Sequence, residues 1–228
     1  MILSAAILFG AMNTQDPSLP RKIRFSGYDW NVKRSEGKVG PGPNYFDGSA
    51  ESAFVDAKGR LHLKVKKSEK GWTCSEVVLS KSLGYGRYTF TLNTQPKLLD
   101  DSVILGAFLY ADDTREIDFE LSRWGDAKSF NGQFVVQPYA TEGNMERYEI
   151  PVQSEEPNVT IDWKPDVINF TAKAQGLSKS WSYKGKDNFV PGDERFIFNF
   201  WLMQGNPPKV EKEYEVVMSK FLYSKARG

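Results

Sequence analysis

Residues 115–121 read Arg-Glu-Ile-Asp-Phe-Glu-Leu, so three acidic residues alternate with three apolar ones. A period of two predicts a β-strand with one buried face, and it places the carboxylates of Glu116, Asp118 and Glu120 on the same side of that strand. Residues two apart on a strand lie roughly 6.7 Å apart, so the three like charges repel one another, and no basic residue stands between them. A strand does not need this arrangement to fold.

Glycoside hydrolysis is the chemistry that such carboxylates perform. In the retaining mechanism one carboxylate attacks the anomeric carbon, and a protonated carboxyl about 5–5.5 Å away donates to the leaving oxygen. Glu116 and Glu120 are about 13 Å apart at Cα on a flat strand, so both side chains must lean inward across a concave sheet. Asp118 between them would raise at least one pKa, because close like charges do not all ionise together.

The alternative interpretation of this segment is a solvated edge strand, whose charges protect against aggregation. Such protection usually comes from Lys or from mixed signs. Three acids of one sign beside Trp124 suit catalysis better, and we favour the catalytic interpretation.

The motif Glu-x-Asp-x-Glu of residues 116–120 resembles the signature of the family-16 glycoside hydrolases. The match is to the form without an inserted bulge residue, as in bacterial lichenases (endo-1,3-1,4-β-glucanases) and plant xyloglucan endotransglycosylases. The resemblance implies that Glu116 is the nucleophile, Glu120 the acid/base and Asp118 the assisting carboxylate. It implies a retaining, endo-acting hydrolase of a β-linked polysaccharide, with a β-glucan as the first expectation. Transglycosylation stays open, because it uses the same glycosyl-enzyme intermediate.

The resemblance also implies sugar-binding residues in other segments. Gln133 keeps the family's residue, whereas Val135 and Gln137 replace an Asn and a Tyr, and Val78 replaces an Arg. Sugar recognition is therefore expected to differ from that of lichenases. A flat indole such as that of Trp201 can stack on a pyranose ring. The predicted substrate-binding residues are Glu76, Gln133, Gln137, Trp124, Asn199, Trp201, Asn44 and Tyr45.

Five of these assignments have a structural alternative. Glu76 could be a surface residue paired with a lysine, and the segment with Asn199 and Trp201 could be a strand buried on both faces. Asn44 and Tyr45, expected on the rim of the cleft, could be ordinary residues of a Gly/Pro-rich loop.

Short alternating segments punctuated by Gly and Pro predict an all-β, antiparallel β-sandwich, and the resemblance makes it a concanavalin A-like jelly roll. The length predicts one catalytic domain, residues 21–228. Trp163, before a Lys-Pro-Asp turn, is predicted in the core. A non-catalytic carbohydrate-binding protein on the same fold is the second function class, since fold does not determine function.

Composition excludes several other classes. The net charge of +1 gives no reason to expect a nucleic-acid or membrane partner, and we expect a monomer whose partner is a polysaccharide. With one cysteine, Cys74, and one histidine, His62, neither a disulfide framework nor a His/Cys metal site is supported. We expect Cys74 to be buried and His62 to be an exposed strand residue. The resemblance implies no cofactor for catalysis and allows a structural calcium ion, for which no Asp/Asn cluster singles out ligands.

Residues 2–12 form an apolar run that is too short for a membrane span and resembles the core of a secretory signal, although the usual basic start is missing. We therefore expect residues 1–20 to be a leader and a loose N-terminus. The mature protein is then secreted, periplasmic or on the cell surface. The alternative is a buried N-terminal strand.

Overall fold

A computed structural model describes residues 20–226, so nearly all of the predicted leader lies outside the described chain. Within these residues the regular structure consists of β-strands and two short 3₁₀-helices, η1 (Pro96–Leu98) and η2 (Met203–Gly205). No helix in the described part is long and apolar enough to cross a membrane.

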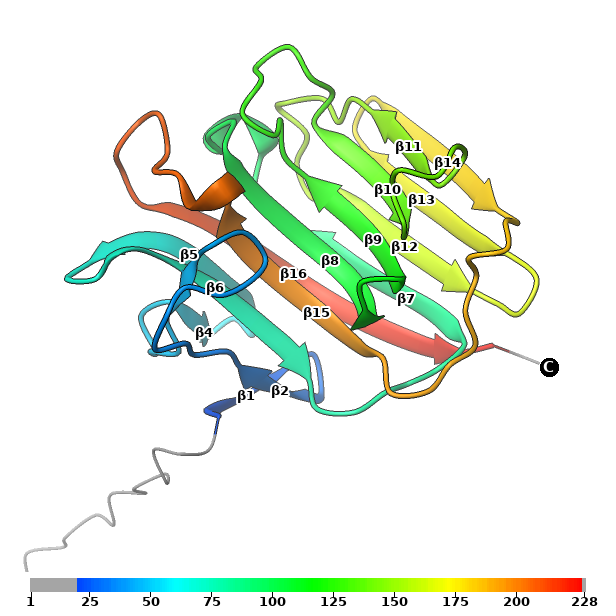
Figure 1. Cartoon of the computed structure of the whole chain (residues 1–228), viewed down its shortest axis with the longest axis horizontal. Coiled ribbons are helices and arrows are strands. Elements are labelled where there is room, and N and C mark those ends of the chain that lie inside the picture. The colour runs from blue at the N-terminus through cyan, green and yellow to red at the C-terminus, as the bar shows by residue number, and fades with distance from the viewer. Residues whose placement is uncertain (1–19, 227–228) are drawn as a thin grey trace, which may run out of the picture.

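The strands form two antiparallel layers (Figure 1). The layer nearer the viewer, called the front sheet, contains in spatial order β1 (Lys22–Phe25), β2 (Tyr28–Val32), β6 (Gly71–Leu79), β15 (Arg195–Leu202), β8 (Val103–Asp112), β9 (Arg115–Leu121), β10 (Gly132–Val136) and β11 (Met145–Tyr148). The back sheet contains β4 (Ala53–Val55), β5 (Leu61–Ser68), β16 (Tyr214–Lys225), β7 (Gly86–Leu92), β12 (Asn158–Trp163), β13 (Ile168–Ala174) and β14 (Leu177–Tyr183).

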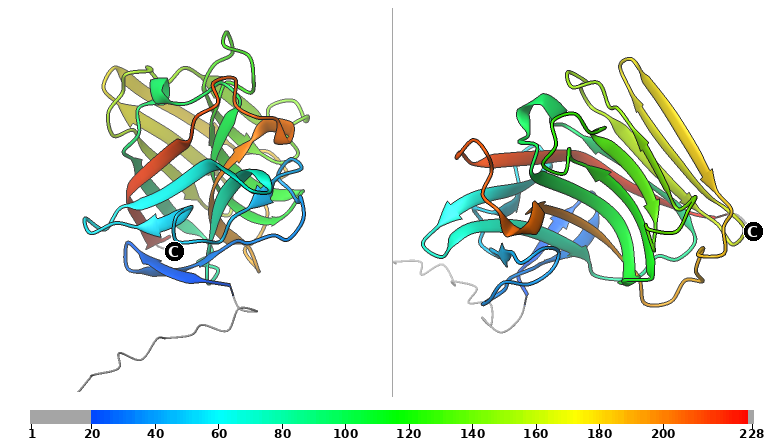
Figure 2. Two further views of the ribbon diagram at one scale, coloured as in Figure 1. Left: turned by 90° about the vertical axis from the view of Figure 1, so that its left-hand side faces the viewer. Right: turned by 45° about the horizontal axis from the view of Figure 1, so that its top comes forward.

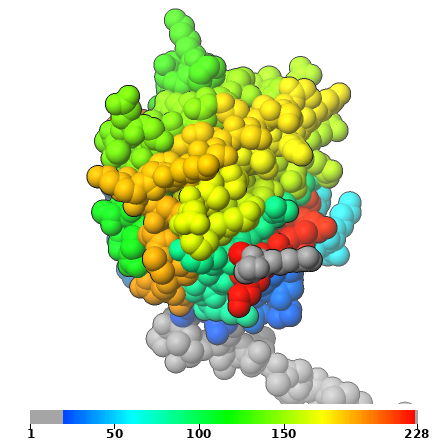
Figure 3. Space-filling view, turned by 90° about the vertical axis from the view of Figure 1, so that its right-hand side faces the viewer, coloured from blue at the N-terminus to red at the C-terminus, as the bar shows by residue number. Residues whose placement is uncertain are grey.

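The two sheets are continuous at one end. The hairpin of β5 and β6 pairs Lys66–Ser68 with Gly71–Thr73, and the rest of each strand then joins a different sheet. The two-residue β3 (Tyr45–Phe46) pairs with β6 in parallel. The strands of the front sheet bend along their length (Figure 2), and β13 and β14 lie over one side of the sandwich (Figure 3).

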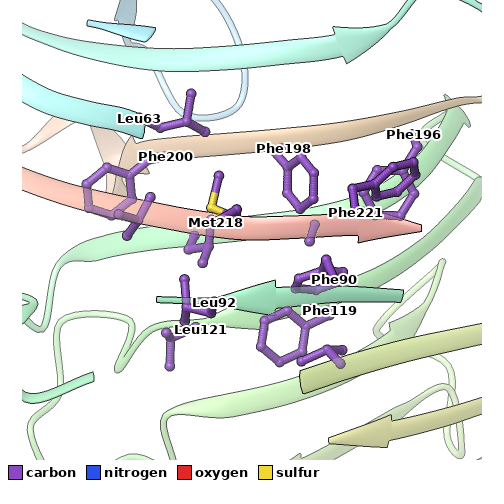
Figure 4. Packing of buried hydrophobic residues seen from close by; sticks show 14 of the residues in the cluster. Leu63, Phe90, Leu92, Phe119, Leu121, Phe196, Phe198, Phe200, Met218 and Phe221 are labelled. Carbon is purple, nitrogen blue, oxygen red and sulfur yellow. The ribbon is translucent and has the colours of Figure 1, made fainter. Parts of the chain in front are cut away.

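The core lies between the sheets and is rich in phenylalanine (Figure 4). Phe90 of the back sheet contacts Phe119 and Phe198 of the front sheet, with ring centroids 5.5 and 5.4 Å apart. All three side chains are fully buried. Burying a Phe side chain stabilises a fold by about 1.5–3 kcal/mol, so this cluster holds the two sheets together.

These observations confirm the predicted all-β antiparallel sandwich and the core positions of Trp163 and Cys74. The prediction for His62 was wrong, because the residue is only 8% exposed. Its ring stacks on Phe54 with centroids 4.5 Å apart and lies between the carboxylates of Asp56 and Glu215. Alternation identified the correct face of the strand, but it did not reveal that other side chains cover that face.

Candidate active site

Strand β9 lies inside the front sheet, with β8 on one side and β10 on the other (Figure 1). Its apolar residues Ile117, Phe119 and Leu121 are buried in the core, as the alternation predicts. The side chains of Glu116, Asp118 and Glu120 therefore project from the opposite, outer face of the sheet. We call these three residues the acid triad.

A polar row crosses the front sheet at the level of Glu120. The strand register places Glu120 between Gly106 of β8 and Gln133 of β10. The row continues on both sides, and from β11 to β6 its members are Arg147, Gln133, Glu120, Gly106, Asn199 and Glu76. Five strand spacings of about 4.8 Å make this row about 24 Å long.

A glycine in the middle of the polar row leaves room for the side chain of Asn199. A Cβ atom on Gly106 would lie 2.5 Å from Oδ1 of Asn199 and 3.2 Å from the ring of Phe108. Oδ1 of Asn199 is buried and has no hydrogen-bond partner among the described residues. Gly106 thus lets the side chain of Asn199 lie against β8, and a larger residue at this position would displace it.

The acid triad forms part of the lining of an open cavity of about 310 Å³. Phe108 and Tyr110 of β8 and Ile197 and Trp201 of β15 supply apolar and aromatic surface next to the acids. Asp113, in the turn between β8 and β9, accepts a hydrogen bond from the Tyr110 hydroxyl at 2.9 Å. The cavity combines ring-stacking surface with acidic groups, as a sugar site requires.

The electrostatics of Glu116 and Asp118 are coupled. Burial raises the pKa of Glu116 to about 7, a hydrogen bond from Asp118 lowers it, and the charges of Glu120 and Asp113 raise it. Burial, followed by the charges of Glu116 and Glu120, raises the pKa of Asp118 well above its usual range. Asp118 is 4% exposed, and its Oδ1 has no hydrogen-bond partner among the described residues. The carboxyl that interacts with Asp118 is Glu116, so a proton on Asp118 can be shared with it.

Glu120 has a different environment. Burial raises its pKa, whereas a hydrogen bond from Gln133, the charge of Arg147 and the indole of Trp124 lower it. Leu121 faces the core, and Trp124 favours the charged form. Neither Trp124 nor Leu121 therefore raises the pKa of Glu120, and burial within the sheet produces the increase.

Glu76 and Lys33 form an ion pair in the wall of the cavity, with Nζ and Oε2 3.0 Å apart. Burial raises the pKa of Glu76, while Lys33 and a hydrogen bond from Asn199 lower it. Nζ of Lys33 also donates to the carbonyl of Gly40 at 2.8 Å. Glu76 thus borders the site as predicted and is linked to the loop that follows β2.

The structure does not bring the side chains of Asn44 and Tyr45 into this cavity. Asn44 is buried, and its Nδ2 donates to the carbonyls of Pro41 and Leu202 at 2.9 and 2.8 Å. It fixes the rim loop, while Gly40 and Pro41 line the cavity instead. Tyr45 lines a separate hollow of about 1040 Å³, which is larger but contains no member of the acid triad.

Other predicted residues lie close to the acid triad. Gln137, just beyond β10, donates from Nε2 to Oδ2 of Asp118 at 3.2 Å. Asn199 and Trp201 line the cavity, which favours the sugar-binding interpretation of this strand. Trp124 does not line the cavity but lies under the guanidinium of Arg147, 4.4 Å from the ring centroid.

Sequence reasoning missed several residues of the site. Lys33, Phe108, Tyr110, Asp113 and Arg147 belong to strands or turns that only the pairing of the sheet brings together. Phe108 and Tyr110 could have been predicted, because they lie two residues apart, and so on one face, in the strand that precedes the motif. No group of three or more His, Cys, Asp or Glu side chains within residues 20–226 is arranged to hold a metal ion, so these residues offer no carboxylate cluster for calcium.

No protein-family model and no curated protein sequence matches the chain. Solved structures share its fold. A β-glucanase of Bacillus licheniformis superposes with a TM-score of 0.67 at 14% identity, over 93% of this chain and 100% of that one. A β-1,3-1,4-glucanase (lichenase) from a mouse hindgut metagenome gives a TM-score of 0.68 at 15% identity, over 91% and 100%.

A third similar structure is a Mycobacterium tuberculosis protein described as an immunostimulatory antigen and pseudo β-1,3-glucanase. It gives a TM-score of 0.67 at 17% identity, over 87% of this chain and 91% of that one. The chain therefore has the jelly-roll fold of the β-glucanases, and the predicted fold is confirmed.

Proposed function

We propose that the chain is a retaining, endo-acting glycoside hydrolase that cleaves a β-linked polysaccharide, in the first place a β-glucan, by double displacement. The observation that carries the proposal is the placement of Glu116 and Glu120 on either side of the buried Asp118, at one open cavity. Raised pKa values of all three carboxyls are typical of groups that hold and transfer protons near neutral pH.

The proposed reaction has two steps. First, the carboxylate of Glu116 attacks the anomeric carbon, the glycosidic bond breaks, and Glu120 gives its proton to the leaving oxygen. Second, Glu120 takes a proton from water, the water oxygen attacks the anomeric carbon, and the bond to Glu116 breaks. Two inversions retain the β configuration. If a sugar hydroxyl replaces the water, the same intermediate leads to transglycosylation.

Asp118 assists by keeping Glu116 ionised. Its own pKa lies far above the usual range, so it retains a proton at neutral pH and can donate that proton as a hydrogen bond to Glu116. A protonated Asp118 adds no charge beside the nucleophile. The charge of the pair therefore resides on Glu116, where the attack requires it.

Features around the acid triad support a polymeric substrate. The polar row runs across the strands over about 24 Å, which suits an internal segment of a chain of sugars. Trp201, Phe108 and Tyr110 offer ring faces along the same surface. Two of the similar structures are described as a β-glucanase and a β-1,3-1,4-glucanase, which favours a β-glucan as substrate.

The proposal includes export and action as a monomer. Residues 1–20 have the composition of a leader, which supports export. The mature protein recovered from its host is expected to begin beyond residue 12. An intact N-terminus in a cytoplasmic fraction would contradict export without affecting the chemistry.

A non-catalytic carbohydrate-binding protein is the second candidate. The observation that favours it is the similarity to a structure described as a pseudo β-1,3-glucanase. The acid triad argues against this candidate. A protein that only binds sugar has no need for three adjacent carboxyl groups, each with a raised pKa.

Reducing-end release from a panel of polysaccharides separates the two candidates. The wild type is expected to release reducing ends from at least one β-linked polymer, whereas Glu116→Gln, purified identically, releases none. Early NMR spectra of the product should show the β anomer, and an α product would exclude the retaining mechanism. Binding of a polymer without release from any member of the panel would establish the second candidate.

A further inference from the structure

Arg147 lies on β11, the edge strand of the front sheet, and faces the same side as the acid triad. Its Nε donates to Oε1 of Gln133 at 3.0 Å, and Nε2 of Gln133 donates to Oε2 of Glu120. Among residues 20–226, Arg147 forms no salt bridge. The acids beside it are paired elsewhere, Glu146 with Lys179 and Glu149 with Arg123.

This chain of hydrogen bonds has only one workable direction. A guanidinium has five N–H donors and no acceptor, so it can bond only to the oxygen of the Gln133 amide. The NH₂ group must then point to Glu120. If the amide were reversed, its oxygen would face a carboxylate and its NH₂ would face a cation, and both contacts would be unfavourable.

Trp124 restrains the guanidinium. The residue has a positive φ of 48°, which is uncommon outside glycine, and Gly125 follows at 80°. Its backbone N–H donates to Oγ of Ser122 at 2.9 Å, which fixes the turn. The indole then lies 4.4 Å from the guanidinium of Arg147, at stacking distance.

We propose that Arg147 is a positioning residue that acts through Gln133: it fixes the orientation of the amide and thereby determines which oxygen of Glu120 carries the proton that is transferred. The inference rests on the proposed role of Glu120 as the acid/base. With Oε2 accepting from Gln133, the proton resides on Oε1. The same amide N–H then stabilises the carboxylate that remains after the proton has moved to the leaving oxygen.

Besides Gln133, the indole of Trp124 donates to Glu120, and that indole is itself stacked on Arg147. No other charged group around Glu120 substitutes for Arg147. Its own strand offers the acids Asp118 and Glu116, β8 offers only Gly106 at this level, and Asn199 and Glu76 lie beyond it. The cation in the cavity wall on the far side is Lys33, which is paired with Glu76. Arg147 is the cation whose charge acts on Glu120.

The first test replaces Arg147 by Met, which keeps the length of the stem and removes the charge and the N–H donors. For a series of aryl glycosides, we expect kcat/KM of Arg147→Met to fall roughly tenfold or more for poor leaving groups and much less for activated ones, because only poor leaving groups need the proton. A loss of equal size across the series would indicate a merely structural role and would overturn the proposal.

The second test is a double-mutant cycle. Because Arg147 acts through Gln133, adding Arg147→Met to Gln133→Leu should cause little further loss, whereas additive losses would overturn the proposal. Lys179→Met is the matched control, since it removes a cation from β14 that pairs with Glu146 and not with the polar row. Its kinetics should equal those of the wild type, and unchanged circular dichroism should accompany each variant.

A third measurement does not depend on activity. In protein with ¹³C-labelled glutamate side chains, the carboxyl signal of Glu120 should titrate at higher pH in Arg147→Met than in the wild type, because a cation that favours the charged form has been removed. An unchanged titration would overturn the proposal even in an active enzyme. If the wild type releases no sugar, the proposed function fails, and the titration still tests the contact.

Discussion

Two clusters of acidic residues, one on each sheet, have opposite electrostatics. On the back sheet, Asp56 accepts hydrogen bonds from Arg60 and His62, and Glu215 lies 3.0 Å from the other nitrogen of His62. The backbone N–H of Arg60, followed by the Arg60 and His62 side chains, holds the pKa of Asp56 well below its usual range. The acid triad on the front sheet takes part in no salt bridge within the described residues, and its pKa values are raised.

The difference shows what each cluster does for the protein. Carboxylates matched by cations favour the folded state, because folding supplies their partners. Buried carboxyls without cations disfavour the folded state at neutral pH, because the unfolded chain lets them ionise freely. The back-sheet cluster therefore stabilises the fold, whereas the acid triad reduces its stability and supplies groups that exchange protons.

The largest expected effect comes from breaking the acid triad. Glu120→Ala and Glu116→Ala should each lower the activity on polysaccharide by about 10³-fold or more. With an activated aryl glycoside, azide should rescue Glu120→Ala and give a β-glycosyl azide, because the anion enters the space of the missing carboxyl. Glu116→Ala should give an α-glycosyl azide instead. If the two products are exchanged, so are the roles of the two residues.

The next effect concerns pH and uses the raised pKa of Glu116. The nucleophile must be ionised, so kcat/KM should fall about tenfold for each pH unit below about 7. The apparent value belongs to the coupled acid triad and not to one carboxyl. Stopped assays between pH 4 and 9 measure the profile. A profile that stays flat down to pH 5 would show that the acid triad does not hold its proton as described.

A smaller effect tests how the acid triad changes the stability of the folded protein. In the wild type the pKa of Glu116 is raised to about 7, so the folded state loses stability as the pH rises from the ordinary glutamate value to about 7. Glu116→Gln avoids this loss. It should be more stable than the wild type at pH 8 by about 2 kcal/mol, or roughly 4–8 °C in Tm. At pH 4 the two proteins should melt together, and a stabilisation that persists there would have another origin.

The smallest effect is expected at the back-sheet cluster, with the opposite sign. The pKa of Asp56 is lowered, so its contribution to stability is present above the ordinary aspartate value and is lost as the pH falls through the folded value. Asp56→Asn should therefore lower Tm at pH 7 by no more than about 2–4 °C. The difference from the wild type should shrink on acidification. A higher Tm for Asp56→Asn at pH 7 would remove the contrast between the clusters.

The sequence predicted what depends on spacing within one strand. The period of two placed Glu116, Asp118 and Glu120 on one face, and it placed Asn199 and Trp201 on one side of β15. Arg147 and Lys33 could not be predicted in this way. They reach the site because β11 pairs with β10 and because the end of β2 lies beside β6, and these are tertiary pairings that leave no local signal.

Two further residues show why resemblance alone was insufficient. Asn44 lies in the loop that was expected at the rim, yet its amide holds the backbone of Pro41 and Leu202. His62 lies on the predicted face of its strand, yet Phe54 and two carboxylates cover it. The function of a polar side chain depends on which buried groups around it still need a hydrogen-bond partner, and the sequence does not show this.

The position of β15 between β6 and β8 has a consequence for biosynthesis. Glu76 and Asn199 are neighbours in the polar row, but β15 is made long after both strands that it separates. Until β15 is inserted, a growing chain exposes the unpaired edges of β6 and β8, which are open to pairing with other molecules. Pairings this distant in sequence also slow folding. The cleft is therefore completed only after β15 has been made, and a nascent chain that stops before residue 195 is prone to aggregation.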